Sequence, residues 1–292
     1  MSWSYFKKLA RRFNILLSQL SQLPHDFSRQ ISILGTKRLG QSETEIPLEV
    51  LVVVHAYWPQ QFIVIIKRLN RINMPLSVVV TIPQGEHAIQ IEELLPTVSK
   101  HHNVSTMRVE NAGRDVGPFL KAIDTFANRN WDLVIKVHTK ASQNIWFETL
   151  VKSLLQSDRR IQNHARLLMR YPKGIIVHPF FRYPGHKQLL TDPAMNRMTN
   201  DLIRHNFSIP TKWYFAAGSM FAAKTELLIA LKHESEIMKF TEFEDENSYS
   251  QGSLAHVYER FIGLYVCTRG DGLLGTSIID FFNFKALKAK LQ

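Results

Sequence analysis

Two polar loops hold the side chains of this sequence that are best suited to chemistry. Residues 110–115 follow an apolar run and include Arg114 and Asp115, and residues 138–142 follow the apolar run 131–137. Ligands of open α/β sheets bind outside the carboxyl ends of the strands, so both loops are predicted to lie at a ligand site. Their cationic, imidazole, hydroxyl and carboxylate groups together suit a ligand that carries phosphate and many hydroxyl groups.

The first loop has the features of an anion-binding turn. Gly113 allows a tight bend at the end of a strand, and Gly117 with the proline after it opens a helix whose free N–H groups would face an anion. Arg114 can bind phosphate or carboxylate with two parallel hydrogen bonds, and Asp115 can accept from ribose or a base. The structural alternative is an Arg–Asp pair that only fixes the loop.

The second loop offers charge for a diphosphate. Lys136 and Lys140 can hold its negative charge, and His138 can bond a leaving-group oxygen or transfer a proton. Lys136 lies inside an otherwise apolar strand, where an unpaired charge is costly, so a carboxylate partner is expected. The alternative is an ordinary Lys–Asp bridge, with Asp115 as the candidate partner.

Further candidate groups lie in the second half of the chain. The densest acidic cluster, Glu242 to Glu246, indicates either a solvated helix start or the source of a general base, because sugar chemistry needs a carboxylate near the acceptor hydroxyl. His256, Glu259 and Arg260 have the spacing of one helical face. Such a group is either structural or part of a site.

The first half of the chain alternates apolar runs with amphipathic segments. The runs predict buried strands at residues 48–54, 76–82, 104–109 and 131–137, and the segments between them predict helices at 60–72, 89–95 and 119–126. Strands that alternate with helices favour a parallel sheet built from βαβ units. The hydrophobic periodicity and the order of the predicted elements alone give residues 48–142 the form of a nucleotide-binding half-domain.

The second half is less regular. Helices are predicted at 145–155, 158–169 and 254–266, a short strand at 174–178, a turn-rich substrate loop at 179–193, and a strand or hairpin arm at 213–223 with Gly218 inside it. Thr225 is predicted to cap a helix that begins at Glu226. The run Gly270 to Gly275 matches a dinucleotide fingerprint in spacing, but too little chain follows it, and it is interpreted as a turn.

The charge balance bounds the partners. A formal net charge of +11 and a pI near 9.7 favour nucleic acid, phosphorylated small molecules or an acidic membrane surface. Neither an RNA-binding nor a helix-turn-helix signature is found, so nucleic acid is not the expected partner. One cysteine, Cys267, excludes an internal disulfide and favours a reducing compartment.

The N-terminal stretch is basic and amphipathic. Residues 1–25 contain four basic residues and no acidic one, and their apolar side chains recur at steps of three and four: Trp3, Phe6, Leu9, Phe13, Leu16 and Leu20. The pattern predicts a helix that either lies in a membrane interface or packs on the globular domain. It indicates neither a secretory signal nor a bilayer span. Residues 24–47 are interpreted as a connector.

Five ordered motifs resemble the rhamnan synthesis protein F family of bacterial polysaccharide assembly. As they stand here they are HAYWP, ENAGRDVGPFL, WDLVIKVHTKAS with Trp146 beyond it, AAGSMFAAKTELL and QGSLAHVYERFIG, spanning about residues 50–265. The resemblance implies an A-type glycosyltransferase with a Rossmann-like, mixed but mainly parallel sheet flanked by helices. Such an enzyme uses a nucleotide-activated sugar, with rhamnose the name-giving sugar, to extend a surface polysaccharide.

The resemblance also implies roles for individual residues. Donor binding is expected from the first three motifs, at His55, Tyr57, Asn111, Gly113, Arg114, Asp115, Lys136, Thr139, Lys140 and Ser142. Acceptor or supporting roles are expected at Gly218, Ser219, Glu244, Asp245, His256, Glu259 and Arg260. Glu246 is the expected general base and His138 the second catalytic group.

Two positions depart from the family pattern. Where A-type transferases place an Asp-x-Asp metal motif, this chain has His138-Thr139-Lys140, so cationic side chains are expected to stabilise the leaving diphosphate. No cofactor is assigned, and dependence on a divalent cation, Mg²⁺ or Mn²⁺, stays open. Gln251 stands before Gly252 where an acid is expected.

The sequence therefore predicts residues 1–47 as an amphipathic helix with its connector, and 48–292 as a glycosyltransferase A-like domain. Within that domain, 48–142 is the predicted nucleotide-sugar-binding half and 143–292 the acceptor half. The expected function is transfer of a sugar to a growing bacterial surface polysaccharide, lipopolysaccharide or lipid-linked glycan by single displacement. The alternative is a non-catalytic nucleotide-sugar or glycan-binding component of a synthase complex. The expected location is the cytoplasm, with possible contact of residues 1–25 with the inner face of the plasma membrane.

Overall fold

The apolar runs of the first half form parallel strands, as their composition predicts. In the computed structural model they are β1 (Val50–His55), β2 (Ser77–Pro83), β3 (Asn103–Val109) and β4 (Leu133–His138). The structure describes residues 46–126, 128–141, 145–185, 193–243 and 253–276, all within one compact unit. The predicted helix of residues 1–25 and its connector lie outside these residues. Among the described helices, none is both long and apolar enough to cross a membrane.

Strands from both halves of the chain join one sheet of seven strands. Its order is β3-β2-β1-β4-β8-β5-β9, with β5 at Ile175–Val177, β8 at Phe221–Ala223 and β9 at Leu273–Gly275. The first four strands are parallel, and β5 pairs with β9 in parallel, whereas β8 runs antiparallel to both of its neighbours. The predicted mixed, mainly parallel α/β sheet is therefore confirmed.

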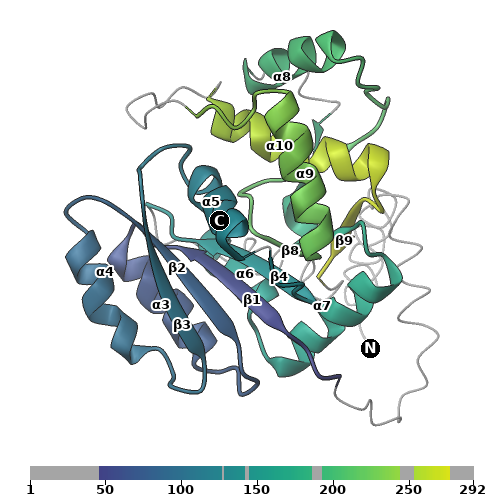
Figure 1. Cartoon of the computed structure of the whole chain (residues 1–292). Coiled ribbons are helices and arrows are strands. Elements are labelled where there is room, and N and C mark those ends of the chain that lie inside the picture. Colours follow the sequence, from purple (N-terminus) through teal and green to yellow (C-terminus); the bar gives the residue numbers. More distant parts are fainter. Residues whose placement is uncertain (1–45, 127, 142–144, 186–192, 244–252, 277–292) are drawn as a thin grey trace, which may run out of the picture. The chain divides into compact units, whose positions relative to one another are not determined.

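Helices cover both faces of the sheet because the strands are apolar on both sides. In β1, Leu51 and Val53 pack in one core, while Val52 and Val54 pack in the other, as the two-residue period of a strand requires. The first core is covered by α5 (Val116–Phe126), α8 (Pro193–Arg204), α9 (Thr225–Ile237) and α10 (Leu254–Arg269). Figure 1 shows α8, α9 and α10 gathered on one side of the sheet.

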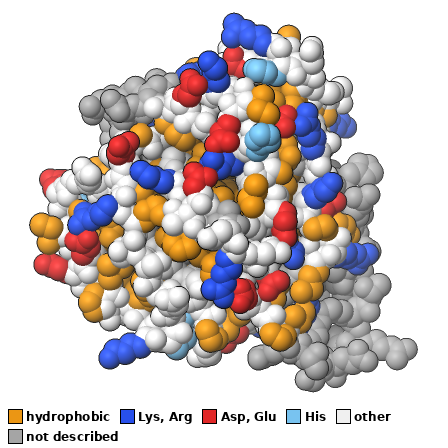
Figure 2. Space-filling view, viewed as in Figure 1, with side chains coloured by type: hydrophobic (Ala, Val, Ile, Leu, Met, Phe, Trp, Pro, Cys, Tyr) orange, Lys and Arg blue, Asp and Glu red, His pale blue; other side chains and the backbone are white. Residues whose placement is uncertain are grey.

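The second core is covered by the other helices. They are α3 (Pro59–Leu69), α4 (Ala88–Leu94), α6 (Ile145–Leu154) and α7 (Asp158–Arg170). The short helices η1 (Leu95–Thr97) and η2 (Pro179–Phe181), and a separate two-stranded sheet of β6 (Arg182–Pro184) and β7 (Tyr214–Ala216), complete the described elements. On the face drawn in Figure 2, side chains of both charge signs are interspersed.

Two predictions for the second half are wrong, a third holds only in part, and one helix was missed. Residues 213–223 are neither one strand nor a hairpin arm, because β7 and β8 belong to different sheets and Gly218 and Ser219 between them have φ of 88° and 45°. Thr225 does not cap α9; its hydroxyl instead bonds the backbone N–H and carbonyl of Trp131. The run 270–275 is a turn followed by strand β9, and α8 was not predicted.

Candidate active site

The carboxyl ends of the central strands meet at one edge of the sheet. His55 at the end of β1 is in register with Thr81 of β2 and with His138 at the end of β4. The antiparallel β8 begins at this same edge, where Phe221 pairs with Lys136. The turn that precedes β8 therefore returns residues of the second half to the strand ends of the first half.

Lys136 has the carboxylate partner that its burial requires. It is 1% exposed, and its ammonium group forms an ion pair with Asp115 Oδ2 and donates to the carbonyl of Ser219 at 2.9 Å. The Ser219 hydroxyl donates to the same Asp115 oxygen at 2.5 Å. His138 Nδ1 lies 3.4 Å from that oxygen. Three predicted residues and the turn before β8 thus form one buried polar cluster.

The cluster favours an ionised carboxylate beside neutral imidazoles. Burial acts to raise the pKa of Asp115, but attraction to His138 and Lys136 and the hydrogen bonds from Lys136 and Ser219 hold that pKa well below its ordinary value. Burial lowers the pKa of His138 well below its ordinary value despite the attraction of Asp115. Burial also lowers the pKa of His55 to about 4. Both rings are therefore neutral near pH 7.

The loop after β3 presents Arg114 from a tight bend. Gly113 and Arg114 have φ of 72° and 53°, the left-handed region that Gly113 was predicted to supply. A side chain at Gly113 would also collide with the ring of Phe243, which lies 2.5 Å from the position of its Cβ. The N–H groups of Val116 and Gly117 both bond the Gly113 carbonyl, so the predicted exposure of these donors to an anion is wrong.

Arg114 reaches the start of α10 instead of pairing with its neighbour. Its guanidinium donates to Nε2 of His256 at 2.9 Å, and Nδ1 of the same ring lies 3.2 Å from the Ser253 hydroxyl. Because Nε2 accepts from arginine, the neutral tautomer of this ring carries its proton on Nδ1. The loop after β3 and the first turn of α10 are joined by this contact.

Glu259, one turn further along α10, is a second carboxylate at the same edge. It accepts from the backbone N–H of Gly218 at 2.5 Å and from Arg260 at 2.6 Å. Burial raises its pKa, and the nearby charge of Asp115 adds to this, although Arg260, the Gly218 N–H and Lys140 oppose it. A carboxylate with a raised pKa is better matched to accepting a proton near neutral pH.

Lys140 stands beside this second carboxylate. A Cβ placed on Gly218 would lie 3.6 Å from both the Lys140 ammonium and Nε1 of Trp146. The ammonium group is 5.2 Å from the centre of the Trp146 ring. The same ring stacks on Phe181, with the two ring centres 5.3 Å apart. Trp146 is 36% exposed and Lys140 itself is half-buried, unlike the fully buried Lys136.

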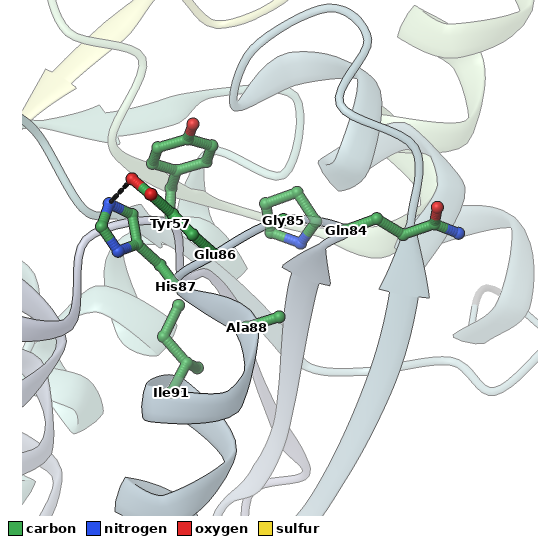
Figure 3. A pocket seen from close by; sticks show the side chains of 8 residues that line it. Tyr57, Gln84, Gly85, Glu86, His87, Ala88 and Ile91 are labelled. Carbon is green, nitrogen blue, oxygen red and sulfur yellow. Dashed lines mark ion pairs between the residues drawn. The ribbon is translucent and has the colours of Figure 1, made fainter.

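Thr139, directly after β4, contacts the segment that follows β1. The Thr139 hydroxyl accepts from the N–H groups of Tyr57 and Trp58 at 2.9 and 3.0 Å, which fixes the start of α3. Tyr57 also lines a cavity of about 10 Å³ at the end of β2, together with Gly85, Glu86 and His87 (Figure 3). That volume has room for about one water molecule.

The structure gathers most of the predicted site and leaves four residues outside the described range. His55, Asp115, Lys136, His138 and Ser219 form the buried cluster or border it, and Arg114, Lys140, Gly218, His256, Glu259 and Arg260 surround its edge. Asn111 lies in the loop between β3 and Gly113. Ser142, Glu244, Asp245 and Glu246 lie outside the described residues.

Three contacts of this edge were not foreseen from the sequence. They are the Phe243 ring against Gly113, the Trp146 indole beside Lys140, and the His87 ring against Tyr57 and Trp58. Only Trp146 had a signal in the sequence, since it stands just beyond the third family motif. The other two contacts arise from tertiary packing between distant segments.

The residues at the Asp-x-Asp position do not fit a divalent cation. Hard cations take oxygen ligands, whereas here one side chain is a cation, one is a buried imidazole, and the Thr139 hydroxyl is bonded to backbone N–H groups. Across the described ranges, no three His, Cys, Asp or Glu side chains converge as a set of metal ligands.

The family model described as rhamnan synthesis protein F matches residues 11–270. The chain belongs to the rhamnan synthesis protein F family. Its five motifs, and with them both strand-end loops, fall inside the matched range.

Curated relatives of this family member are longer than the chain. The uncharacterised protein WxcX, in two strains of Xanthomonas campestris pv. campestris, is 28% identical over 231 residues. The match covers 75% of this chain and 31% of WxcX, so the chain spans about a third of the length of these relatives. A crystal structure of S. aureus TarS, residues 1–349, aligns with a TM-score of 0.40 and 15% identity, over 82% of this chain and 64% of that one.

Proposed function

We propose that this chain is a glycosyltransferase that moves a sugar from a nucleotide-sugar donor to a growing bacterial surface polysaccharide. Membership of the rhamnan synthesis family supports the polymer class. The observation that carries the proposal is the grouping of Arg114, Lys140 and Glu259 at the edge where parallel strands end. Cations there suit a departing diphosphate, and a carboxylate with a raised pKa suits an incoming hydroxyl.

The proposed reaction is a single displacement. The acceptor oxygen attacks the anomeric carbon as the bond from that carbon to the diphosphate oxygen breaks, and the hydroxyl proton passes to a carboxylate. Charge then builds on the nucleoside diphosphate, where Arg114 and Lys140 stabilise it. Groups that are already positioned for charge in the transition state lower the barrier without further reorganisation.

The carboxylate that takes the proton is either Glu259 or Glu246. Glu259 is supported by its raised pKa and by the N–H of Gly218, which orients it. Glu246, the base expected from the sequence, lies outside the described residues and stays a prediction. Glu259→Gln and Glu246→Gln each removes one candidate without changing side-chain size, and the exposed Glu226→Gln on α9 is the matched control. The variant that loses the greater part of turnover, by ~10²-fold or more, identifies the base.

The buried groups are proposed to position the site. Asp115, Lys136 and Ser219 tie the loop after β3, strand β4 and the turn before β8 into one unit. His138, 3% exposed, remains the second candidate for contact with the leaving group. Tyr57 and His87 at the ends of β1 and β2 are candidate neighbours of the nucleotide base, and rhamnose is the candidate sugar.

A donor screen tests the proposal. Purified protein is incubated with each nucleotide sugar and with lipid-linked or polysaccharide acceptors, with and without a chelator, and product is detected by mass spectrometry. Transfer from one donor supports the enzyme, and the chelator arm decides the role of a divalent cation. Binding of a donor in calorimetry without transfer selects the alternative, a non-catalytic nucleotide-sugar or glycan-binding component.

We also propose that the protein acts in the cytoplasm, at the inner face of the plasma membrane, through residues 1–25. Basic residues beside an apolar stripe support this, because such helices bind anionic lipid surfaces. Cosedimentation with vesicles that contain phosphatidylglycerol should fall when Lys7, Lys8, Arg11 and Arg12 are changed to Gln. Equal cosedimentation of this variant and the parent protein would reject the membrane contact.

A further inference from the structure

A wide groove lies beside the candidate active site, between α8, the end of α9 and the start of α10. Its volume is about 650 Å³, within the range of pockets that hold organic ligands. By contrast, the cavity at Tyr57 holds about 10 Å³. Of these two spaces among the described residues, the groove is the larger. The proposed binding of the donor gives the groove no role.

The groove wall contains both hydrogen-bond donors and hydrogen-bond acceptors. The polar lining residues from α8 and its end are Arg197, Asn200, Asp201, Arg204 and His205, and those from the segment after α9 are Lys239 and Glu242. Arg204 donates to Asp201 at 3.1 Å, which leaves the carboxylate, 25% exposed, with capacity for further donors. In Figure 2 side chains of both signs and histidines lie close together over α8, at the top of the view.

This composition selects the class of ligand. A site for diphosphate would be lined mainly by cations, whereas here three basic side chains and a histidine are accompanied by two carboxylates and an amide. Each sugar hydroxyl both donates and accepts, so neighbouring hydroxyls on a ring suit amide and carboxylate oxygens beside arginine and lysine N–H groups. The groove therefore fits an uncharged or weakly charged oligosaccharide.

Two segments of the groove wall also belong to the candidate active site. Glu242 lines the groove, and Phe243, the next residue, packs its ring against Gly113. Leu254 lines the groove at the start of α10, and His256, on the same turn, contacts Arg114. A ligand in the groove is thus bounded by the same segments that support Arg114.

We propose that this groove binds the acceptor glycan, holding sugar units behind the one whose hydroxyl is extended. The proposal rests on the glycosyltransferase function above for its reaction. The binding itself depends only on the groove. Units held there would raise affinity for longer acceptors, because each added ring that reaches the groove adds contacts to α8.

The test uses variants on one helix. Asn200→Ala with Asp201→Ala removes an amide and a carboxylate from the groove, and Asn196→Ala, at an exposed position of α8 that does not line it, is the matched control. The probes are oligosaccharides of two to six units prepared from bacterial rhamnose-containing surface polysaccharide. Their affinity for the full-length protein is measured by calorimetry without donor, and inorganic diphosphate is the anionic probe.

The expected result is a loss of oligosaccharide affinity of about tenfold or more in the double variant, with the Asn196→Ala protein unchanged. In transfer assays the acceptor KM should rise by a similar factor, while the donor KM and kcat stay the same. Unchanged oligosaccharide affinity, absence of oligosaccharide binding by the parent protein, or a loss confined to diphosphate would each overturn the proposal.

The two proposals fail in different ways. If no donor is turned over but oligosaccharide binding depends on Asn200 and Asp201, the groove assignment stands and the transferase assignment falls. If sugar is transferred with an acceptor KM that ignores both substitutions, the transferase stands and the groove assignment falls.

Discussion

Lys136 and Lys140 are four residues apart, and the structure places them in opposite environments. Lys136 lies in the carboxyl half of β4 and is 1% exposed, and its ammonium group contacts Asp115 and Ser219. Lys140 lies in the loop beyond, half-buried, with its ammonium group 5.2 Å from the Trp146 ring. The sequence suggested the same diphosphate-binding role for both. The difference indicates that Lys136 stabilises the structure of the site, whereas Lys140 is placed to contact a ligand.

The strongest way to break this comparison is Lys136→Met. It leaves the Asp115 carboxylate buried without its partner, so the free energy of unfolding should fall by about 3–5 kcal/mol. Chemical denaturation measures the loss. A double variant, Asp115→Leu with Lys136→Met, should regain much of this stability, because apolar residues replace the whole pair. A single variant as stable as the parent protein would contradict the scaffold role of Lys136.

Lys140→Met should do the reverse. Turnover should fall by about 10²–10³-fold, because one preorganised cation is lost from the leaving-group side, while the free energy of unfolding changes by less than about 0.5 kcal/mol. Kinetics on the identified donor and a denaturation curve measure both quantities. Lys152→Met, at an exposed position of α6, is the matched control. Equal turnover of the two variants would remove Lys140 from the site.

Acid titration sharpens the interior side of the comparison. The pKa of His55 is lowered from 6.5 to about 4 in the folded protein, so burial of the neutral ring stabilises the fold fully above pH 6.5. As the pH falls from 6.5 to 4 this stabilisation is lost. The total loss in unfolding free energy is about 3 kcal/mol. His55→Gln should flatten the fall in unfolding free energy between pH 6.5 and 4. Substitution of the exposed His233 by Gln is the control, and identical pH profiles for His55→Gln and the parent protein would refute the assignment.

Glycine substitutions sharpen the loop side. Gly113 and Gly272 both have φ in the left-handed region, at 72° and 81°, but only Gly113 faces a ring, that of Phe243. Gly113→Ala should therefore cost about 1–2 kcal/mol more than Gly272→Ala, as measured by thermal or chemical unfolding. It should also lower turnover, since Arg114 follows directly. Phe243→Ala in the Gly113→Ala background should recover part of the stability. Equal losses of unfolding free energy for Gly113→Ala and Gly272→Ala would show that the Phe243 ring moves aside without cost.

The first half of the fold was readable from sequence because its strands are apolar on both faces. The runs 48–54 and 131–137 needed no knowledge of their partners to predict burial, and β1 and β4 lie within two residues of those bounds. The same reasoning missed α8, although Met195, Met198 and Leu202 have helical spacing there. Its proline and polar neighbours resemble the turn-rich segment before it.

The site was only partly predictable, for a physical reason. That Lys136 needs a carboxylate follows from the cost of burying a charge. That Ser219 and Glu259 join the same edge follows from the antiparallel placement of β8 and the packing of α10, which are non-local and leave no periodic signal. The left-handed pair Gly218 and Ser219 breaks the apolar run 213–223, which by composition alone resembles one strand.

The reversed direction of β8 has a consequence for how such proteins diversify. Because this one strand enters the sheet from the opposite end, everything between β5 and β8 is a detour that leaves the strand-end edge and returns to it. If the groove beside α8 binds the acceptor, as proposed, variation in that segment changes the choice of acceptor while the parallel strands and their cations stay the same. We expect chimaeras that exchange residues 178–217 between relatives, and so keep Gly218 and Ser219 of the host, to retain the donor of the host and take the acceptor of the guest.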